Sequence, residues 1–323
     1  MSDAVLVTGG RGFLGSHLVR ALVRRGRNVV AFDLSEGEPS VPSNDSSGSV
    51  ENVVGDVTDV GMLLDLIESR GVSDVIHTAA QIGEKQSLVD PRRFLRVNAE
   101  SVWDMCDAFR NTNLRRLICI STRSAYGSYP PDAGPLSETA ALRPEAFYGA
   151  SKAAADIVLA AYRAHFGLDA VAVRITGLYG PGQTYHTPLS EMVEAAVMGK
   201  PYYRASGADF RYELTYVKEV VRGLLSILDA ERLQYPIYNI TAGDQPRLAE
   251  VAEIVKSCVP EAVIELGVEP DEGLAPRARM DGSRLEEELG YLPIWSMPDA
   301  VHELVDWYRD HAYGREIESS PST

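Results

Sequence analysis

The stretch that decides the fold is Ala4-Val5-Leu6-Val7-Thr8-Gly9-Gly10-Arg11-Gly12-Phe13-Leu14-Gly15. Its apolar start predicts a buried strand, which leads directly into glycines spaced three apart and then into a helical pattern. Such glycines allow a tight turn and let the backbone approach a pyrophosphate, while the N-terminus of the helix favours the anion. A lone glycine triplet also occurs in ordinary loops. In this context it predicts a dinucleotide phosphate site at Gly9, Gly12, Phe13, Leu14 and Gly15.

The second predicted strand, Val29–Phe32, ends at Asp33, about 18 residues after the last of these glycines. A carboxylate there accepts hydrogen bonds from the adenosine ribose hydroxyls and repels a 2′-phosphate. Asp33 therefore predicts NAD, in preference to NADP, as the cofactor. The alternatives are that Asp33 only caps a turn, and that Arg11 assists a 2′-phosphate.

Short β-branched runs alternate with amphipathic helical patterns through the first half of the chain, and this alternation predicts a parallel sheet. The predicted strands are Ala4–Val7, Val29–Phe32, Val53–Val54, Val75–His77, Leu117–Ile120, Ala170–Ile175 and Ile237–Ile240. The predicted helices are Leu14–Arg25, Met62–Ser69, Phe94–Phe109, Ala146–His165, Leu248–Ser257 and Met297–Asp310. We expect an α/β fold: a Rossmann-type doubly wound parallel sheet with a smaller, sequence-interleaved α/β substrate lobe.

A chain of 323 residues is long for one domain, and the regular alternation lapses after Gly177. We expect an NAD-binding Rossmann domain over 1–176, with a returning segment near 214–240, and a mainly substrate-binding lobe over 177–323. The stretch Tyr179–Phe210, rich in Gly, Pro and Tyr, predicts loops that line a pocket. Two further irregular stretches are predicted, a surface loop at Glu36–Ser49 and a frayed polar tail at Gly314–Thr323.

The composition excludes several classes of function. A formal net charge of −15 opposes nucleic-acid backbones and anionic lipid surfaces, because non-specific binding to phosphates depends on Lys and Arg. No apolar run approaches the roughly 18 residues that a membrane span needs, and the N-terminus shows no signal-peptide pattern. The three cysteines lack metal-ligand spacing. We expect a cytoplasmic protein with a small-molecule substrate, no metal, no nucleic acid and no membrane partner.

The candidate chemical groups follow the fifth predicted strand and open the next helix. Thr122 comes just after the run Leu117–Ile120, and Tyr148 and Lys152 are four residues apart, so they share one face of a helix. A neighbouring ammonium and a positively charged nicotinamide both favour the phenolate, which lowers a tyrosine pKa from about 10 toward working pH. Tyr148 can then take an alcohol proton as hydride leaves. The Tyr-x-x-x-Lys spacing is common by chance, but the glycine turn and Thr122 favour this interpretation.

A set of short motifs is spread over nearly the whole chain. They are Thr-Gly-Gly-x-Gly-Phe-Leu-Gly at 8–15, Gly55-Asp56-Val57, His77-Thr78-Ala79-Ala80, Ser121-Thr122 with Tyr126-Gly127, Tyr148-x-x-x-Lys152, Arg174 with Tyr179-Gly180-Pro181-Gly182, and Tyr238-Asn239-Ile240. In this combination they resemble the extended short-chain dehydrogenase/reductases, and within these the nucleotide-sugar epimerase/dehydratase family. The resemblance implies that Thr122 hydrogen-bonds the reacting hydroxyl and that Lys152 also binds the nicotinamide ribose.

The same resemblance implies further cofactor contacts and an oligomeric state. Asp56 and Val57 would meet the adenine. The remaining implied cofactor residues are Ala79, Ala80, Asn98 and Ile175. A homodimer is also implied, through the helices near 94–109 and 146–165.

Two positions depart from the family's pattern. Dehydratases of this group carry an Asp-Glu pair just after the catalytic Thr, as the acid and base that expel water, whereas this chain has Arg123-Ser124. Nucleotide-sugar epimerases have an Asn where this chain has Gly177. The resemblance also implies diphosphate-contacting arginines at Arg211 and Arg279. The candidate substrate residues are therefore Gln81, Arg123, Ser124, Gly177, Arg211 and Arg279.

Arg123 has two interpretations. A guanidinium directed into the pocket matches a carboxylate bidentately, which indicates an acidic sugar or hydroxy acid as substrate. Alternatively, Arg123 folds back onto a local acid. We expect an NAD-dependent epimerase, of a nucleotide sugar, that works through a keto intermediate. The alternative is an NAD-dependent dehydrogenase of an acidic sugar or hydroxy acid with the same Thr, Tyr and Lys. A non-catalytic NAD-sensing protein is a third alternative, against which the intact Thr122, Tyr148 and Lys152 argue.

Overall fold

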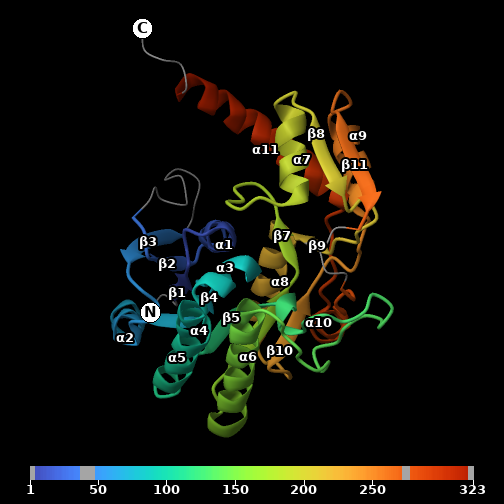
Figure 1. Cartoon of the computed structure of the whole chain (residues 1–323). Helices are drawn as coiled ribbons and strands as arrows, with labels where there is room; N and C mark the ends of the chain where they lie inside the picture. The colour runs from blue at the N-terminus through green and yellow to red at the C-terminus, as the bar shows by residue number, and fades with distance from the viewer. Residues whose placement is uncertain (1–3, 37–47, 271–276, 319–323) are drawn as a thin grey trace.

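A central sheet of seven parallel strands organises the molecule (Figure 1). The computed structural model describes residues 4–36, 48–270 and 277–318. The strand order is β10-β6-β5-β4-β1-β2-β3. The chain therefore builds the sheet outward from β1 to β3 on one side, and then returns to add β4, parallel to β1, on the other side. The strands are β1 (Ala4–Thr8), β2 (Asn28–Asp33), β3 (Ser49–Val54), β4 (Val72–His77), β5 (Arg116–Thr122), β6 (Ala170–Ile175) and β10 (Ile237–Ile240). The predicted doubly wound Rossmann-type sheet is confirmed.

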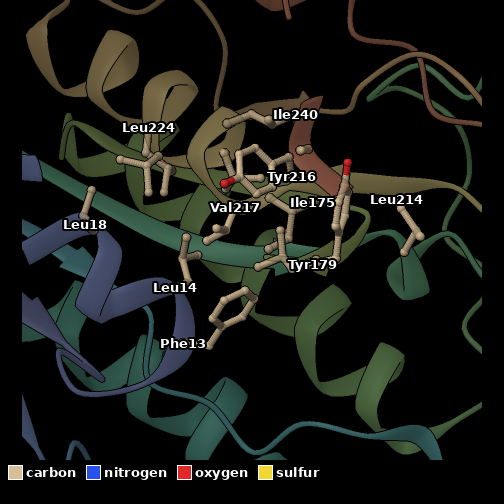
Figure 2. Packing of buried hydrophobic residues seen from close by; sticks show 14 of the residues in the cluster. Phe13, Leu14, Leu18, Ile175, Tyr179, Leu214, Tyr216, Val217, Leu224 and Ile240 are labelled. Atoms are coloured by element: carbon tan, nitrogen blue, oxygen red, sulfur yellow. The ribbon is translucent and has the colours of Figure 1, made fainter. Parts of the chain in front are cut away.

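Helices cover both faces of this sheet because alternate strand residues point to opposite sides. Val5 and Val7 of β1 belong to a core shared with α1 (Phe13–Arg24) and α8 (Val217–Asp229). Figure 2 shows part of this core. Leu6 points the other way, into a second core under the helices α2 (Val60–Arg70), α5 (Ser101–Phe109) and α6 (Phe147–Phe166). The predicted strands and crossover helices are therefore present, with ends that differ by a few residues.

The segment between β4 and β5 contains more helix than the sequence predicts. The short helices α3 (Glu84–Val89) and α4 (Pro91–Leu95) precede a π-helical turn at Arg96–Glu100, which continues into α5. A π turn widens the helix by one residue and occurs often at functional sites. The single predicted helix Phe94–Phe109 thus begins earlier and changes its pitch around Asn98.

The chain beyond β6 builds a second group of elements (Figure 1). Two small parallel sheets pair β7 (Gly177–Tyr179) with β9 (Leu214–Tyr216), and β8 (Tyr202–Ser206) with β11 (Ile264–Glu269). The helices here are α7 (Pro188–Val197), α9 (Leu248–Cys258), α10 (Ser283–Leu289) and α11 (Met297–Glu318), of which α7, α9 and α11 pack on one another. This group is interleaved with the sheet, since β10 and α8 come from the same part of the chain.

Two sequence expectations differ from the structure. The stretch Tyr179–Phe210 is not only loop, because Thr187 caps α7 through a capping box with Ser190 and Pro188 occupies a first-turn position. The tail predicted from Gly314 is helical as far as Glu318. Most of the predicted Glu36–Ser49 loop, residues 37–47, lies outside the described residues. Within the described ranges, no helix has the length and apolarity needed to cross a membrane.

Candidate active site

A cavity of about 1780 Å³ lies at the carboxyl ends of the parallel strands, beside the reversal of strand order between β1 and β4. This edge is where doubly wound sheets bind their ligands. Because single-ligand pockets usually measure about 300–1,000 Å³, the cavity has room for a dinucleotide and a second ligand. Of the predicted residues, those that line it are Gly9, Gly12, Phe13, Leu14, Gly15, Asp33, Asp56, Val57, Ala79, Ala80, Gln81, Thr122, Arg123, Ser124, Tyr148, Lys152, Ile175, Gly177 and Arg211.

The glycine-rich turn between β1 and α1 fits a pyrophosphate. A Cβ at Gly15 would lie 2.0 Å from the carbonyl oxygen of Gly9, so only glycine lets the helix begin this close to the turn. Gly12 is the N-cap of α1, and no side chain caps the first turn. The backbone N–H groups there are therefore available to an anion at the cavity.

Asp33, at the end of β2, is held at the cavity by this same turn. Its Oδ2 accepts a hydrogen bond from the backbone N–H of Arg11 at 3.0 Å, and the Arg11 side chain is not among the groups that line the cavity. Asp56 is held in a similar way, since its Oδ1 accepts two bonds from Thr58, each of 2.9 Å. Carboxylates thus stand where the adenosine end of a dinucleotide would lie.

We expect the protein to prefer NAD to NADP because the Asp33 carboxylate would repel a 2′-phosphate. Replacing Asp33 with Asn removes this charge and should reduce the ratio of NAD to NADP affinities by about tenfold or more. Calorimetric titration of the purified protein with NAD and with NADP measures the two dissociation constants. Asp59→Asn, in a helix cap outside the cavity, is the control. Tighter NADP binding by the unmodified protein would contradict the assignment.

Thr122, Tyr148 and Lys152 come together where β5 ends and α6 begins. Gly149 permits this approach, because a Cβ there would lie 2.4 Å from the carbonyl oxygen of Ser124. The Thr122 hydroxyl accepts from the Ser124 N–H at 3.2 Å. The buried Lys152 ammonium donates to the carbonyl oxygen of Ile120 at 2.8 Å, which fixes it at the cavity wall.

The electrostatics of Tyr148 differ from the sequence expectation. Burial raises the pKa of its phenol, the hydrogen bond with Thr122 opposes this increase, and the charge of Glu84 adds to it. Burial also lowers the pKa of Lys152 to about 8. The expected lowering of the Tyr148 pKa by Lys152 is thus not present in the protein alone. A positively charged nicotinamide would act in the required direction.

Asn98, which the resemblance implies as a cofactor contact, is not among the residues that line the cavity. Its side chain is fully buried in the π-helical turn. Oδ1 accepts from the Gln81 N–H at 2.8 Å, and Nδ2 donates to the Gln81 carbonyl oxygen at 2.9 Å and to the Ser151 hydroxyl at 3.1 Å. Because these bonds use both the oxygen and the nitrogen of the amide, Asn98 joins the loop after β4 to α6.

The predicted substrate residues take different positions. Arg123 folds back onto a local acid: Nη1 lies 3.2 Å from Oε2 of Glu213, and Nη2 donates to the Ala278 carbonyl oxygen at 3.0 Å. Arg211 is exposed at the cavity and donates to the Gln245 carbonyl oxygen at 3.2 Å. Arg279 lies outside the cavity, where it donates to the Gly243 carbonyl oxygen at 2.9 Å.

Among the cavity residues that were not predicted are Glu84 and Arg277. Arg277 reaches both carboxylate oxygens of Glu84, at 2.9 and 3.1 Å, and Ser124 donates to Glu84 at 2.8 Å. Glu84 begins α3, and Arg277 lies two residues before the predicted Arg279. The predicted Arg279 is the sequence signal nearest to Arg277. Glu84 lies in no motif that predicts a site residue.

The fold agrees with comparisons to known proteins. The model of the NAD dependent epimerase/dehydratase family matches residues 5–241. A dTDP-glucose 4,6-dehydratase of Streptomyces niveus is 31% identical over 98% of this chain and 96% of that protein. A UDP-glucose 4-epimerase of Mycolicibacterium smegmatis is 29% identical, over 94% of this chain and 98% of that protein. A solved dTDP-glucose 4,6-dehydratase from Streptomyces venezuelae, with NAD bound, has a TM-score of 0.82 and 27% identity, and the match covers 96% of this chain and 98% of that one. The chain therefore belongs to the NAD dependent epimerase/dehydratase family, a family of NAD-dependent enzymes.

Proposed function

We propose that the protein is an epimerase of a nucleotide sugar. When bound, NAD would supply reversible hydride transfer at a carbinol carbon of the sugar, so that the resulting ketone could be reduced again on its other face. Tyr148 accepts the hydroxyl proton and gives it back, while Thr122 orients that hydroxyl. Lys152 holds its ammonium beside them. In this proposal residues 1–176 and 214–240 bind NAD, and 177–323 mainly hold the nucleotide sugar.

The observation that carries the proposal is the engagement of the side chains after Thr122. Elimination of water from a keto sugar needs an acid and a base next to the reacting carbons. Here the residue after Thr122 is Arg123, paired with Glu213, and the next is Ser124, which donates to Glu84. These two side chains are not an acid and base pair of the kind that a dehydratase needs, which favours redox chemistry at one carbon over elimination of water.

A loop held against the start of α1 favours an epimerase, which keeps its cofactor bound, over a dehydrogenase that releases NADH. The segment after β7 contacts the start of α1 through a hydrogen bond of 2.8 Å between His17 Nε2 and the Pro181 carbonyl oxygen. The ring of Tyr185 lies edge-on to that of Phe13, with centroids 6.3 Å apart. A loop held over the glycine-rich turn would slow the exchange of a dinucleotide between turnovers.

The test is to incubate the purified protein with UDP- and dTDP-linked sugars and excess NAD, following reduced nicotinamide by absorbance and the sugar by NMR. An epimerised sugar without net NADH is expected, together with about one NAD released per denatured chain. A new keto or acidic product with stoichiometric NADH would establish the dehydrogenase instead. A 6-deoxy-4-keto product would establish the dehydratase.

A fall in activity above about pH 8 is expected from Lys152, whose pKa burial lowers from 10.5 to about 8. As pH rises through this value the ammonium loses its proton, and the charge-assisted hydrogen bonds that Lys152 would donate to the nicotinamide ribose are weakened. The measurement is kcat/KM as a function of pH. Lys152→Arg keeps the cation and should flatten the profile between about pH 7 and pH 9. The same alkaline fall in this variant would contradict the assignment to Lys152.

A homodimer through α5 and α6 is part of the proposal. These adjacent helices expose large apolar side chains that a monomer would leave in water, among them Trp103 at 55% and Ile157 at 61% exposure. Sedimentation should give twice the chain mass, and the double variant Trp103→Glu with Ile157→Glu should give a monomer. Val268→Glu, on β11, is the matched control, since Val268 is also exposed. An unchanged mass in the double variant would contradict this interface.

A cytoplasmic location is also proposed. Cys106, Cys119 and Cys258 are all free thiols. Free thiols without disulfides are typical of a reducing compartment.

A further inference from the structure

Two of the arginines that line the cavity, Arg123 and Arg277, are each paired with a glutamate. Arg123 lies against Glu213, whose side chain has no exposed surface. The other oxygen of Glu213 accepts from Thr241 and from the Met280 N–H, at 2.8 and 2.9 Å. Arg123 is therefore the cation that neutralises a buried carboxylate. A substrate carboxylate could take Arg123 only by leaving Glu213 buried and unpaired, which is strongly unfavourable.

The second arginine is equally engaged. Arg277 binds both oxygens of Glu84 through Nη2, and its Nη1 lies 3.3 Å from the Ser124 hydroxyl. The side chain of Arg277 is 19% exposed, whereas that of Glu84 is 42% exposed at the cavity. The accessible member of this pair is thus the carboxylate and not the guanidinium. A ligand in the cavity meets a negative group here.

Glu84 has the properties of a hydrogen-bond acceptor for hydroxyls. Burial opposes its ionisation, but the charge of Arg277 and the hydrogen bonds from Arg277 and Ser124 outweigh burial and lower the pKa of Glu84. A carboxylate has about four lone-pair sites, and those not used by Arg277 and Ser124 remain for a ligand. Glu84 also stands close enough to Tyr148 for its charge to raise the pKa of that phenol.

We propose that Glu84, held by Arg277 and Ser124, is a specificity-determining residue that accepts a hydrogen bond from a sugar hydroxyl and selects a neutral sugar over a uronic acid. This inference rests on the proposed function, since it names the class of sugar that the same site takes. A hydroxyl donates to the carboxylate in a charge-assisted bond. A uronate would instead bring a second negative charge beside Glu84, and the two arginines whose charges act on Glu84, Arg277 and Arg123, are already paired with glutamates.

The test measures binding, so that it does not depend on turnover. The NAD-loaded Tyr148→Phe protein is titrated calorimetrically with UDP-glucose, UDP-glucuronate and UDP. We expect UDP-glucose to bind at least about tenfold more tightly than UDP-glucuronate. Adding Glu84→Gln should reduce this preference to about threefold or less, because the repelling charge is gone. Adding Glu84→Asp keeps the charge and should preserve the sign of the preference.

The controls separate specificity from stability and from the proposed function. Glu145→Gln, at an exposed glutamate outside the large cavity, should leave the preference unchanged. If Glu84 only stabilises the fold through Arg277, Glu84→Gln would lower the midpoint of unfolding and leave the ratio of affinities intact, which overturns the inference. Equal binding of both sugars, or tighter binding of UDP-glucuronate, overturns the inference while the epimerase proposal stands. Binding of neither sugar, with dTDP-glucose also failing to bind, overturns both.

Discussion

Replacing Tyr148 with Phe is expected to lower kcat by about 10²- to 10⁴-fold, the usual contribution of one general acid or base. Of the three grouped side chains, Tyr148 in its phenolate form is the one that can accept the hydroxyl proton as hydride leaves, since a threonine hydroxyl does not ionise and the Lys152 ammonium donates to Ile120. The substitution removes one oxygen and leaves the edge-on packing of the ring against Phe94. NAD content and thermal stability should therefore stay close to those of the unmodified protein.

A second tyrosine in the same cavity gives the matched control. The Tyr185 hydroxyl donates to the Leu178 carbonyl oxygen at 3.0 Å, so it is engaged away from the reacting carbon. Tyr185→Phe should lower kcat by less than about tenfold, the cost of one hydrogen bond. Steady-state kinetics with the epimerised sugar compare the two variants. If Tyr148→Phe retained kcat within about threefold, Tyr148 could not be the proton acceptor.

The largest loss of stability is expected from Asp156→Ala, at about 3–5 kcal/mol in the free energy of unfolding. Asp156 accepts from Nε of Arg174 at 2.8 Å, and the two side chains are only 2% and 1% exposed. Removing the carboxylate leaves the guanidinium buried with the Glu138 carbonyl oxygen and the face of the Tyr126 ring as neighbours. Urea unfolding followed by circular dichroism measures the change.

Two further variants test the cause of this loss. Asp156→Leu combined with Arg174→Met removes both charges, and it should cost less than Asp156→Ala because no unpaired ion is left. Asp229→Ala breaks the exposed pair with Arg25, and it should cost no more than about 1 kcal/mol. A double variant less stable than Asp156→Ala would show that packing, and not the unpaired charge, dominates.

Much of the sheet and the reactive centre could be predicted because both follow from local patterns. Apolar runs such as Ala170–Ile175 lie in strands within a residue or two of the predicted ends. Once a parallel sheet is predicted, all its carboxyl ends lie at one edge, so Gly9, Asp33 and Thr122 had to converge there. The spacing of Tyr148 and Lys152 on one helix completed the group.

The rest of the site depends on contacts that no local pattern records. Glu84 and Arg277 are 193 residues apart, and their ion pair exists only after both parts of the chain have folded. Arg123 had two interpretations until Glu213 was found beside it, since the sequence does not state which acid is near. Asn98 sits on a π-helical turn, which shifts the register of the predicted helix and turns its amide into the protein.

The origin of β10 and α8 in the second half of the chain also constrains synthesis. Strand β6 pairs with β10, and α1 packs under α8, so a nascent chain that has emerged only to residue 176 has an open sheet edge and an uncovered helix. At roughly 5–20 residues per second, the ribosome needs several more seconds to deliver the missing elements. A gene truncated after codon 176 should therefore yield aggregated protein. The half of the chain that holds the glycine-rich turn depends on β10 and α8, from the other half, to stay in solution.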